Sequence, residues 1–345
     1  MAQVLMRSLS ESAAATRLLG RRPRLHLSIV LAVTLGAAVY GFREQSLFAC
    51  PVSGYGSDVY LAYCGSTGYG DYDYGAFWFG LEPTATKAAA EADVLFLGNS
   101  RMQFGLSSGS TSSWFAAVHA THYLLGFAYD GNYKFIGPLL NRLRPKARVY
   151  VINLDLFLEE EDRPPSRVVK SDSSAPTRYQ RKRQWQAVHR SVCATLPLIC
   201  DEKAAFFRSR GTGSWHFAGH GNFTSKAVSF DDQVDTGVLN AYVPRGERFL
   251  AEMPVRPECQ ILTMVPTVNT PIGTAKAIAT ALKRPLIVPQ LTDLQTFDES
   301  HLDVTSAEQW SSAFFLEAGP LIQSCLEKSS RTVAGLSEGA SGRAE

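Results

Sequence analysis

The sequence has almost no excess charge of either sign, which limits the partners that it suggests. Its 345 residues include 34 Lys and Arg against 32 Asp and Glu, a formal net charge of +2. Nucleic acid is therefore not an expected partner, because proteins that bind it usually carry a basic surface. The chain is 45% hydrophobic and 19% charged and shows no internal repeat, so it is long enough for one large globular domain or two modest ones.

Motifs that bind metals are also missing. None of the six cysteines forms a CxxC pair, and His189 lies four residues before Cys193 without a second pair to complete a zinc site. His216 and His220 have the same spacing, but the glycine between them disfavours the helix that would align them. The sequence predicts neither a metal nor another cofactor.

Long apolar runs are scarce, and the one present lies near the N-terminus. Residues 25–42 contain no Lys, Arg, Asp or Glu and would rise about 27 Å as a helix, close to the thickness of a bilayer core. Arg17, Arg21, Arg22 and Arg24 lie shortly before this run and only Arg43 just after it, which predicts a cytoplasmic N-terminus. We expect a cytoplasmic tail over residues 1–24, a single transmembrane anchor in an inner membrane over residues 25–42, and a periplasmic or otherwise extracytoplasmic remainder. A cleaved signal peptide and a buried soluble helix are the alternatives.

An extracytoplasmic location would permit disulfide bonds. The cysteines closest in sequence are Cys50 with Cys64 and Cys193 with Cys200. The sequence does not decide the connectivity, and buried free thiols are an equal alternative.

Distinct regions follow the expected anchor. Residues 43–85 are rich in glycine and tyrosine, which predicts irregular structure, with a hairpin as an option, held by a Cys50–Cys64 bond. The tyrosine rings there either stack on a sugar or, as we favour, pack on the domain. Residues 86–328 alternate strands with helices, a pattern typical of a parallel, doubly wound sheet.

Two parts of the chain break this pattern. A charged insertion at about residues 159–225 is expected to contain a basic helix that ends near Arg190, followed by a glycine-rich loop. Residues 329–345 have little apolar content and are expected to be disordered.

The stretch VLFLGNSRMQFG, residues 94–105, is where chemistry is expected. Four apolar residues run into the turn GNSR, so Ser100 lies at the carboxyl end of a strand, where sites form in parallel sheets. A helix that begins there would leave the Ser100 N–H free to hold an oxyanion. His301 follows the last expected strand, and Asp298 precedes it by three residues, a spacing at which the carboxylate can accept a hydrogen bond from the imidazole.

These two stretches resemble the first and last blocks of the SGNH/GDSL hydrolase superfamily, in the forms LFLGNSRMQFG and FDESHLD, with Asn99 where the first block usually has Asp. The GNSR form and the ending HLDxxSAxxWS resemble a membrane-anchored bacterial branch. The resemblance covers about residues 90–315 and implies a flavodoxin-like α/β/α sandwich with a parallel sheet. It also implies that Ser100 is the nucleophile, His301 the base and Asp298 the group that orients the base.

The resemblance implies oxyanion donors besides the N–H of Ser100. The superfamily's second block supplies a glycine N–H after the second strand, and Gly131 fits that place in AYDGNY. Its third block supplies an asparagine beyond the third strand, whereas VINLDLFLEE places Asn153 inside the strand. Asn269, after a later strand, is the substitute candidate.

The side chains beside the nucleophile have two interpretations. Asn99 and Arg101 are candidates for binding substrate, Arg101 through a carboxylate or phosphate group. Arg101 alternatively fixes the turn through a carboxylate such as Asp155, and we slightly favour this structural role.

Together these features predict an extracytoplasmic serine esterase or O-acyltransferase, with acetyl as the expected acyl group. The expected partners are an acylated cell-envelope glycan or lipid, the membrane and, as an option, envelope polysaccharide machinery. The alternative is a non-catalytic glycan-binding or assembly component of a polysaccharide export system. The same triad serves hydrolysis and transfer, so the sequence does not separate them.

Overall fold

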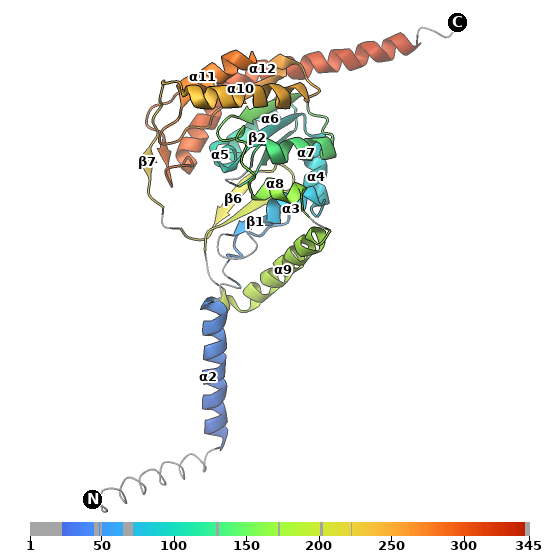
Figure 1. Ribbon diagram of the computed structural model, residues 1–345. Coiled ribbons are helices and arrows are strands. Elements are labelled where there is room, and N and C mark those ends of the chain that lie inside the picture. Colours follow the sequence, from blue (N-terminus) through green and yellow to red (C-terminus); the bar gives the residue numbers. More distant parts are fainter. Residues whose placement is uncertain are drawn as a thin grey trace, which may run out of the picture.

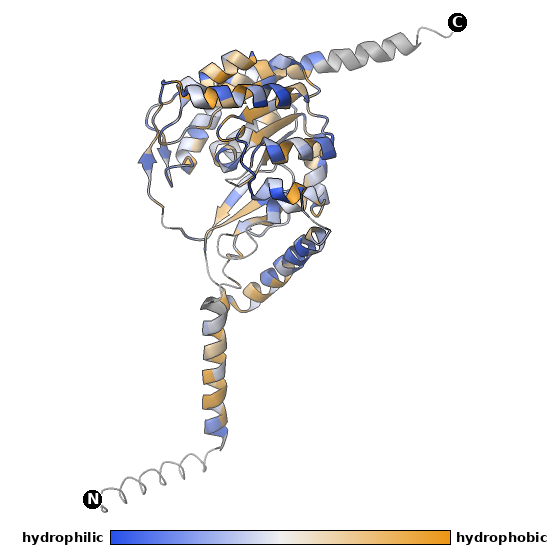
Figure 2. Ribbon diagram, in the orientation of Figure 1, coloured by the Kyte–Doolittle hydropathy of each residue, from blue (hydrophilic) through white to orange (hydrophobic). Residues whose placement is uncertain are grey.

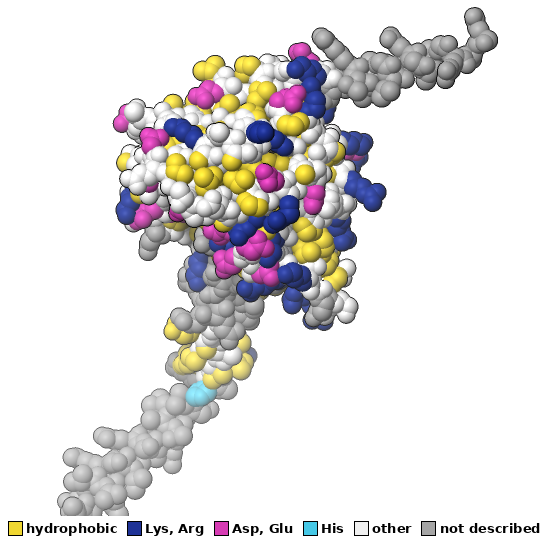
Figure 3. Space-filling model, turned by 45° about the horizontal axis from the view of Figure 1, so that its top comes forward, with side chains coloured by type: hydrophobic (Ala, Val, Ile, Leu, Met, Phe, Trp, Pro, Cys, Tyr) yellow, Lys and Arg dark blue, Asp and Glu magenta, His cyan; other side chains and the backbone are white. Residues whose placement is uncertain are grey.

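The computed structural model describes residues 23–44, 48, 50–64, 72–128, 131–171, 173–200, 203–221 and 223–341. Within them the chain forms a mixed α/β globular part, from which one long helix leads away on the N-terminal side and another at the C-terminal end (Figure 1). The α/β class expected from the alternation of strands and helices is confirmed. On the face that Figure 3 displays, Lys and Arg side chains are interspersed with Asp and Glu side chains.

A four-stranded parallel sheet forms the centre. Its strands are β2 (Val94–Gly98), β3 (His122–Gly126), β4 (Val149–Asn153) and β8 (Gln260–Thr263), in the order β3-β2-β4-β8. Every residue of these strands is buried, as expected for a parallel sheet with both faces covered. Beyond β8 the chain adds one parallel bridge, between Leu262 and Leu286, and Pro285 and Pro289 on either side of it have no N–H to donate to a longer ladder.

Helices form a layer on each face of this sheet. They are α4 (Pro83–Glu91), α5 (Ser100–Gly105), α6 (Ser108–Ala117), α7 (Tyr133–Leu143), α10 (Thr236–Ala251), α11 (Ile272–Leu282) and α12 (Val304–Ser341). Leu95 and Leu97 of β2 lie in one core cluster with residues of α4, α7, α10 and α11. Val94 and Phe96 lie in the other, with residues of α6 and α12, because side chains alternate across a strand.

A second, antiparallel sheet joins two regions that are distant in sequence. It consists of β1 (Val59–Cys64), β5 (Ala205–Ser209) and β6 (Trp215–Ala218), in the order β1-β5-β6. Among the described residues of 43–85, β1 pairs with β5 of the insertion and not with a second strand of the same segment, so the optional hairpin is not seen there. The expected glycine-rich loop is wrong in part, since it contains β6. Local sequence does not encode which distant strand completes a sheet.

Helices α3 (Tyr72–Trp78), α8 (Pro164–Val169) and α9 (Ala175–Thr195) accompany this sheet, and the remaining short elements are η1 (Pro197–Ile199), β7 (Lys226–Ala227), η2 (Pro257–Cys259) and β9 (Gln295–Thr296). Helix α9 contains the expected basic helix and continues beyond Arg190. Tyr60, Tyr72 and Tyr74 are buried in the first core cluster. These rings of the 43–85 region therefore pack on the domain, as the favoured alternative expects.

A buried ion pair ties the antiparallel sheet to the parallel one. Arg208 of β5 donates from Nε and Nη2 to the carboxylate of Asp73 in α3, at 2.9 and 2.7 Å, and both side chains are almost fully enclosed. Its guanidinium also donates to the carbonyl oxygens of Leu124 and Gly126, at the end of β3. Burial lowers the pKa of Arg208, but the interactions with Asp73, Tyr60 and Tyr123 together raise it more, so the net pKa lies above the ordinary value.

Three disulfides join all six cysteines. As expected, Cys50 is bonded to Cys64, the last residue of β1. Cys193, near the end of α9, is bonded to Cys200. The third bond joins Cys259 to Cys325 and fastens the start of β8 to α12. The alternative of buried free thiols is wrong. Proximity in sequence could not propose the third pair, whose members are 66 residues apart.

The N-terminal helix α2 (Pro23–Glu44) extends away from the globular part, and Figure 2 shows its apolar colouring. Its 18-residue window Arg24–Gly41 is long and apolar enough to cross a membrane, and none of it is buried. Residues 1–22 of the expected cytoplasmic tail lie outside the described residues. A signal sequence would have the same length and composition.

The C-terminal helix differs from expectation. Helix α12 continues to Ser341, through most of the segment 329–345 that the sequence predicts to be disordered, and residues 342–345 lie outside the described residues. A helix that is already nucleated by packing adds further residues without a new nucleation cost, so low apolar content alone does not end it.

Candidate active site

Ser100 lies at the first position of α5, directly after β2. Asn99 caps this helix, because its Oδ1 accepts a hydrogen bond from the N–H of Arg101 at 3.0 Å. The turn is tight at Gly98, where a Cβ would lie 3.0 Å from the Cβ of Met102 and 3.1 Å from that of Asn153. Strand, cap and glycine together present a serine that is 7% exposed at the carboxyl edge of the sheet.

The structure brings the three residues of the expected triad together. Nε2 of His301 lies 2.8 Å from Oγ of Ser100, and Nδ1 lies 2.7 Å from Oδ2 of Asp298. The other oxygen, Oδ1 of Asp298, accepts the backbone N–H groups of His301 and Ser300 at 2.8 and 3.1 Å. With the proton on Nδ1 held by Asp298, Nε2 is an acceptor for the serine hydroxyl.

The electrostatic setting keeps the carboxylate charged. Burial raises the pKa of Asp298, but hydrogen bonds from the His301 side chain and from two backbone N–H groups lower it more, so the net pKa lies below its ordinary value. Two rings confine the imidazole. Phe104 lies edge-on with its centroid 4.8 Å from that of His301, and Phe297 is stacked at 5.6 Å.

A polar frame links the serine turn to the histidine loop. Arg101 pairs through Nη1 with Asp155 and donates from Nε to Oγ of Ser300 at 3.0 Å. Asn99 donates from Nδ2 to Oδ2 of Asp155 at 3.0 Å. The structural role expected for Arg101 through Asp155 is confirmed. The substrate-binding roles of Arg101 and Asn99 stay predictions.

The expected oxyanion donor Gly131 lies in the right place but its N–H is used elsewhere. A Cβ at this position would lie 2.9 Å from the carbonyl oxygen of Gly98, so only glycine fits beside the serine turn. The N–H of Gly131 donates to the carbonyl oxygen of Ala128 at 2.8 Å. This N–H is therefore already engaged in the structure, and its role as an oxyanion donor stays a prediction.

Asn153 lies inside the strand, as the sequence predicts, and the role of the substitute candidate Asn269 stays a prediction. Asn153 is fully buried at the end of β4, where its Oδ1 accepts the N–H of Val265 at 3.0 Å. Its Nδ2 has no hydrogen-bond partner among the described residues. Asn269 is exposed, and within the described chain no hydrogen bond joins it to Ser100. Its turn lies near the histidine loop, since the N–H of Val268 donates to Glu299 at 3.4 Å.

The sequence did not indicate the cavity of about 620 Å³ that lies beside the triad. Its lining includes five aromatic side chains from distant parts of the chain, namely Phe104, Trp215, Phe217, Phe223 and Phe297. Gln103 also lines it, one helical turn after Ser100, and donates from Nε2 to the carbonyl oxygens of Leu124 and Gly126 at 3.1 and 2.8 Å. The one sequence signal that could have indicated this cavity is that Gln103 and Phe104 follow the GNSR turn within three residues.

Metal chemistry has no obvious donor set in this part of the molecule. Among the residues that the structure describes, no group of three or more His, Cys, Asp or Glu side chains is placed to hold a metal ion.

No protein-family model, curated protein or solved structure matches the chain. The geometry and chemistry of the site therefore carry its interpretation.

Proposed function

We propose that the protein is a serine esterase or O-acyltransferase that works through Ser100, His301 and Asp298. The observation that carries this proposal is the continuous line of hydrogen bonds from Asp298 through His301 to Oγ of Ser100. A serine hydroxyl is a weak nucleophile until a base that is itself oriented can take its proton, and this line meets that requirement.

The proposed reaction uses two half-reactions. Oγ of Ser100 attacks the ester carbonyl while Nε2 of His301 takes the hydroxyl proton, and the developing imidazolium is stabilised by Asp298. The C–O bond to the alcohol then breaks, His301 returns the proton to the leaving oxygen, and the acyl group stays on Ser100. In the second half, His301 takes a proton from water or from an acceptor hydroxyl, which attacks the acyl-serine and regenerates Ser100.

The strand order supports a flavodoxin-like fold, as the resemblance to SGNH hydrolases implies. Numbered along the chain, the four parallel strands lie in the order 2-1-3-4, and the bridge at Leu286 adds a fifth place beyond β8. That order is the flavodoxin-like one, in which sites form at the carboxyl end of the first strand, where the order reverses. Ser100 lies at this point.

An envelope substrate follows from where we place the domain. The exposed apolar helix α2 supports a single anchor in an inner membrane, with the globular part on the periplasmic or extracytoplasmic side. The three disulfides support an oxidising compartment. A tethered enzyme in that place favours an acylated glycan or lipid over a soluble metabolite.

A fluorophosphonate probe tests the proposal. The full-length protein should be labelled on Ser100, and Ser100→Ala should abolish both labelling and hydrolysis of p-nitrophenyl esters. Ser312→Ala, an exposed serine on α12, is the matched control and should keep both. Failure of the folded wild-type protein to react with the probe would overturn the enzyme proposal.

One observation favours the alternative, a non-catalytic glycan-binding or assembly component. The N–H of Gly131, the expected second oxyanion donor, donates instead to the carbonyl oxygen of Ala128. The loss of one oxyanion donor costs about 10²–10³ in rate. A chain that fails the probe test but binds an envelope polysaccharide would fit this second function.

A further inference from the structure

The aromatic cavity is contiguous with the candidate triad. Phe104 and Phe297, which line it, are the same rings that pack against the imidazole of His301. Gln103, on another part of its lining, lies one helical turn after Ser100. A group held in the cavity therefore lies next to the atoms that are proposed to react.

The lining is apolar and includes rings that solvent can reach. Phe217 and Phe223 are each 43% exposed, although most aromatic rings of the domain are buried. Their centroids lie 5.7 Å apart, and Phe223 lies 4.9 Å from Phe297, so the three rings form one continuous apolar surface. Apolar rings left accessible in a concave site are typical of a surface that a ligand covers.

Charged groups contribute little to this lining. Asp303 lines the cavity, but its Oδ1 accepts the N–H of Ser306 at 2.7 Å, at the start of α12. Glu308 is an exposed residue of the same helix. No Lys or Arg is among the residues that line the cavity. An anionic ligand would meet the carboxylates of Asp303 and Glu308 with no Lys or Arg to pair with, whereas a neutral apolar chain would remove the phenylalanine rings from water.

The volume is too large for the acetyl group that the sequence predicts. At ~30 Å³ for each non-hydrogen atom, the volume that a water molecule occupies in the liquid, an acetyl group needs roughly 90 Å³. The cavity of about 620 Å³ is several times larger. An octanoyl group, with nine non-hydrogen atoms, needs roughly 270 Å³ on the same scale.

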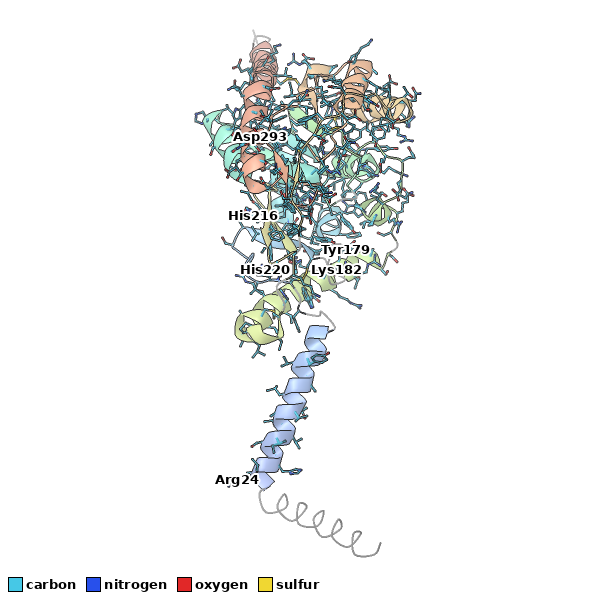
Figure 4. All side chains as sticks on the ribbon, turned by 90° about the vertical axis from the view of Figure 1, so that its left-hand side faces the viewer. Arg24, Tyr179, Lys182, His216, His220 and Asp293 are labelled. Atoms are coloured by element: carbon cyan, nitrogen blue, oxygen red, sulfur yellow. A yellow bond between two sulfur atoms is a disulfide. The ribbon has the colours of Figure 1, made fainter. Side chains whose placement is uncertain are left out.

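We propose that this cavity holds the acyl chain of the substrate, an apolar chain longer than acetyl, for which the cavity of about 620 Å³ has room for up to about twenty non-hydrogen atoms. The inference rests on the proposed serine chemistry and names the group that is transferred. Trp215, His216 and Phe217 of β6, a strand of the insertion, line the cavity together with residues of α5, α6 and the start of α12. Figure 4 shows His216, a residue of β6 at the cavity, in the half of the globular part that faces α2, where a lipid-derived acyl donor would arrive.

A chain-length series tests this proposal on the full-length protein in phospholipid nanodiscs. Each methylene that leaves water should raise kcat/KM about fourfold, from about 0.8 kcal/mol per methylene. We expect p-nitrophenyl butyrate to exceed the acetate at least tenfold, with a further rise to the octanoate. Labelling of Ser100 by the fluorophosphonate together with a flat or falling series would overturn the acyl-chain proposal and leave the serine-enzyme proposal intact.

Paired variants locate the effect in the cavity. Phe217→Asp should lower kcat/KM for the octanoate at least tenfold while it changes the acetate value less than threefold, because only the long chain reaches this ring. Leu316→Ala, an 80% exposed apolar residue on α12 outside the cavity, is the control and should change neither value. Equal losses for both esters in Phe217→Asp would contradict the proposal.

Direct binding keeps the proposal testable even if no ester is hydrolysed. Calorimetric titration of octanamide, a neutral probe with the same chain length, into Ser100→Ala nanodiscs, with empty nanodiscs as the blank, should show saturable binding that Phe217→Asp weakens at least tenfold. Absence of octanamide binding overturns the proposal. Binding of a chitotetraose probe in its place, lost in Phe217→Asp, would also overturn it and make the cavity a sugar subsite.

Discussion

Asp73 and Asp298 are two carboxylates that each pair with a nitrogen-bearing side chain, and the two pairs differ in burial. The side chain of Asp73 is 4% exposed and that of its partner Arg208 is 0% exposed, whereas Asp298 is 27% and His301 is 16% exposed. In the first pair the guanidinium has further acceptors in the backbone of β3. In the second pair, Nε2 of His301 lies within hydrogen-bond distance of Oγ of Ser100.

The difference separates a structural pair from a reactive one. A fully enclosed ion pair cannot exchange a proton with a substrate, and its removal leaves an unpaired charge in the interior. A partly open pair with one nitrogen directed at a serine can accept a proton, pass it on and accept another. The same kind of contact thus stabilises one region and is positioned for chemistry in the other.

The largest effect should come from the reactive pair. Asp298→Asn should lower kcat for ester hydrolysis about 10⁴-fold, because the amide NH₂ donates to Nδ1 and holds the wrong tautomer of His301. The fold should persist, since the remaining oxygen still accepts the backbone N–H groups. Hydrolysis and thermal unfolding measured on the same preparation check this result.

The control for this variant is another carboxylate on the surface. Asp232→Asn removes an exposed partner of Lys276 and should change kcat less than twofold. Activity of Asp298→Asn within tenfold of wild type would break the comparison, because Asp298 would then be no more than a structural carboxylate.

The second prediction concerns the buried pair. Arg208→Met should lower the free energy of unfolding by about 3–5 kcal/mol, because it leaves the charge of Asp73 buried without its partner. The double variant Arg208→Met with Asp73→Leu should be at least about 0.5 kcal/mol more stable than the sum of the two single changes predicts. Urea unfolding of the three variants measures this coupling, and strict additivity would show that the pair does not act as a unit.

Sequence reasoning found the reactive pair and missed the buried one for a physical reason. Ser100 follows an apolar strand, and Asp298 precedes His301 by one turn, so local patterns place all three residues. Arg208 lies in a stretch whose role depends on pairing between β5 and β1, a tertiary contact that local propensity does not determine. The Cys259–Cys325 bond was beyond prediction for the same reason, since its two residues are 66 positions apart.

The smallest expected effect concerns His122, a buried histidine that is not paired with a carboxylate. His122 of β3 is 8% exposed, stacks on Phe115 with centroids 4.4 Å apart, and has no hydrogen-bond partner for Nε2 among the described residues. Burial alone lowers its pKa from 6.5 to about 4. The unfolded chain therefore binds the proton more readily than the folded chain does between these two pH values.

This shift predicts a stability that depends on pH. The contribution of neutral His122 is complete above the unfolded pKa of 6.5 and is lost as the pH falls towards about 4, by roughly 3 kcal/mol at most. His122→Gln cannot gain this proton and should lose that part of the pH dependence, while the carboxylates of both proteins titrate alike. Urea unfolding at pH 7 and pH 4.5 measures the difference. If the free energy of unfolding changed equally with pH in the two proteins, the folded protein would accommodate the imidazolium of His122. Burial without a partner would then matter less than the contrast between Asp73 and Asp298 implies.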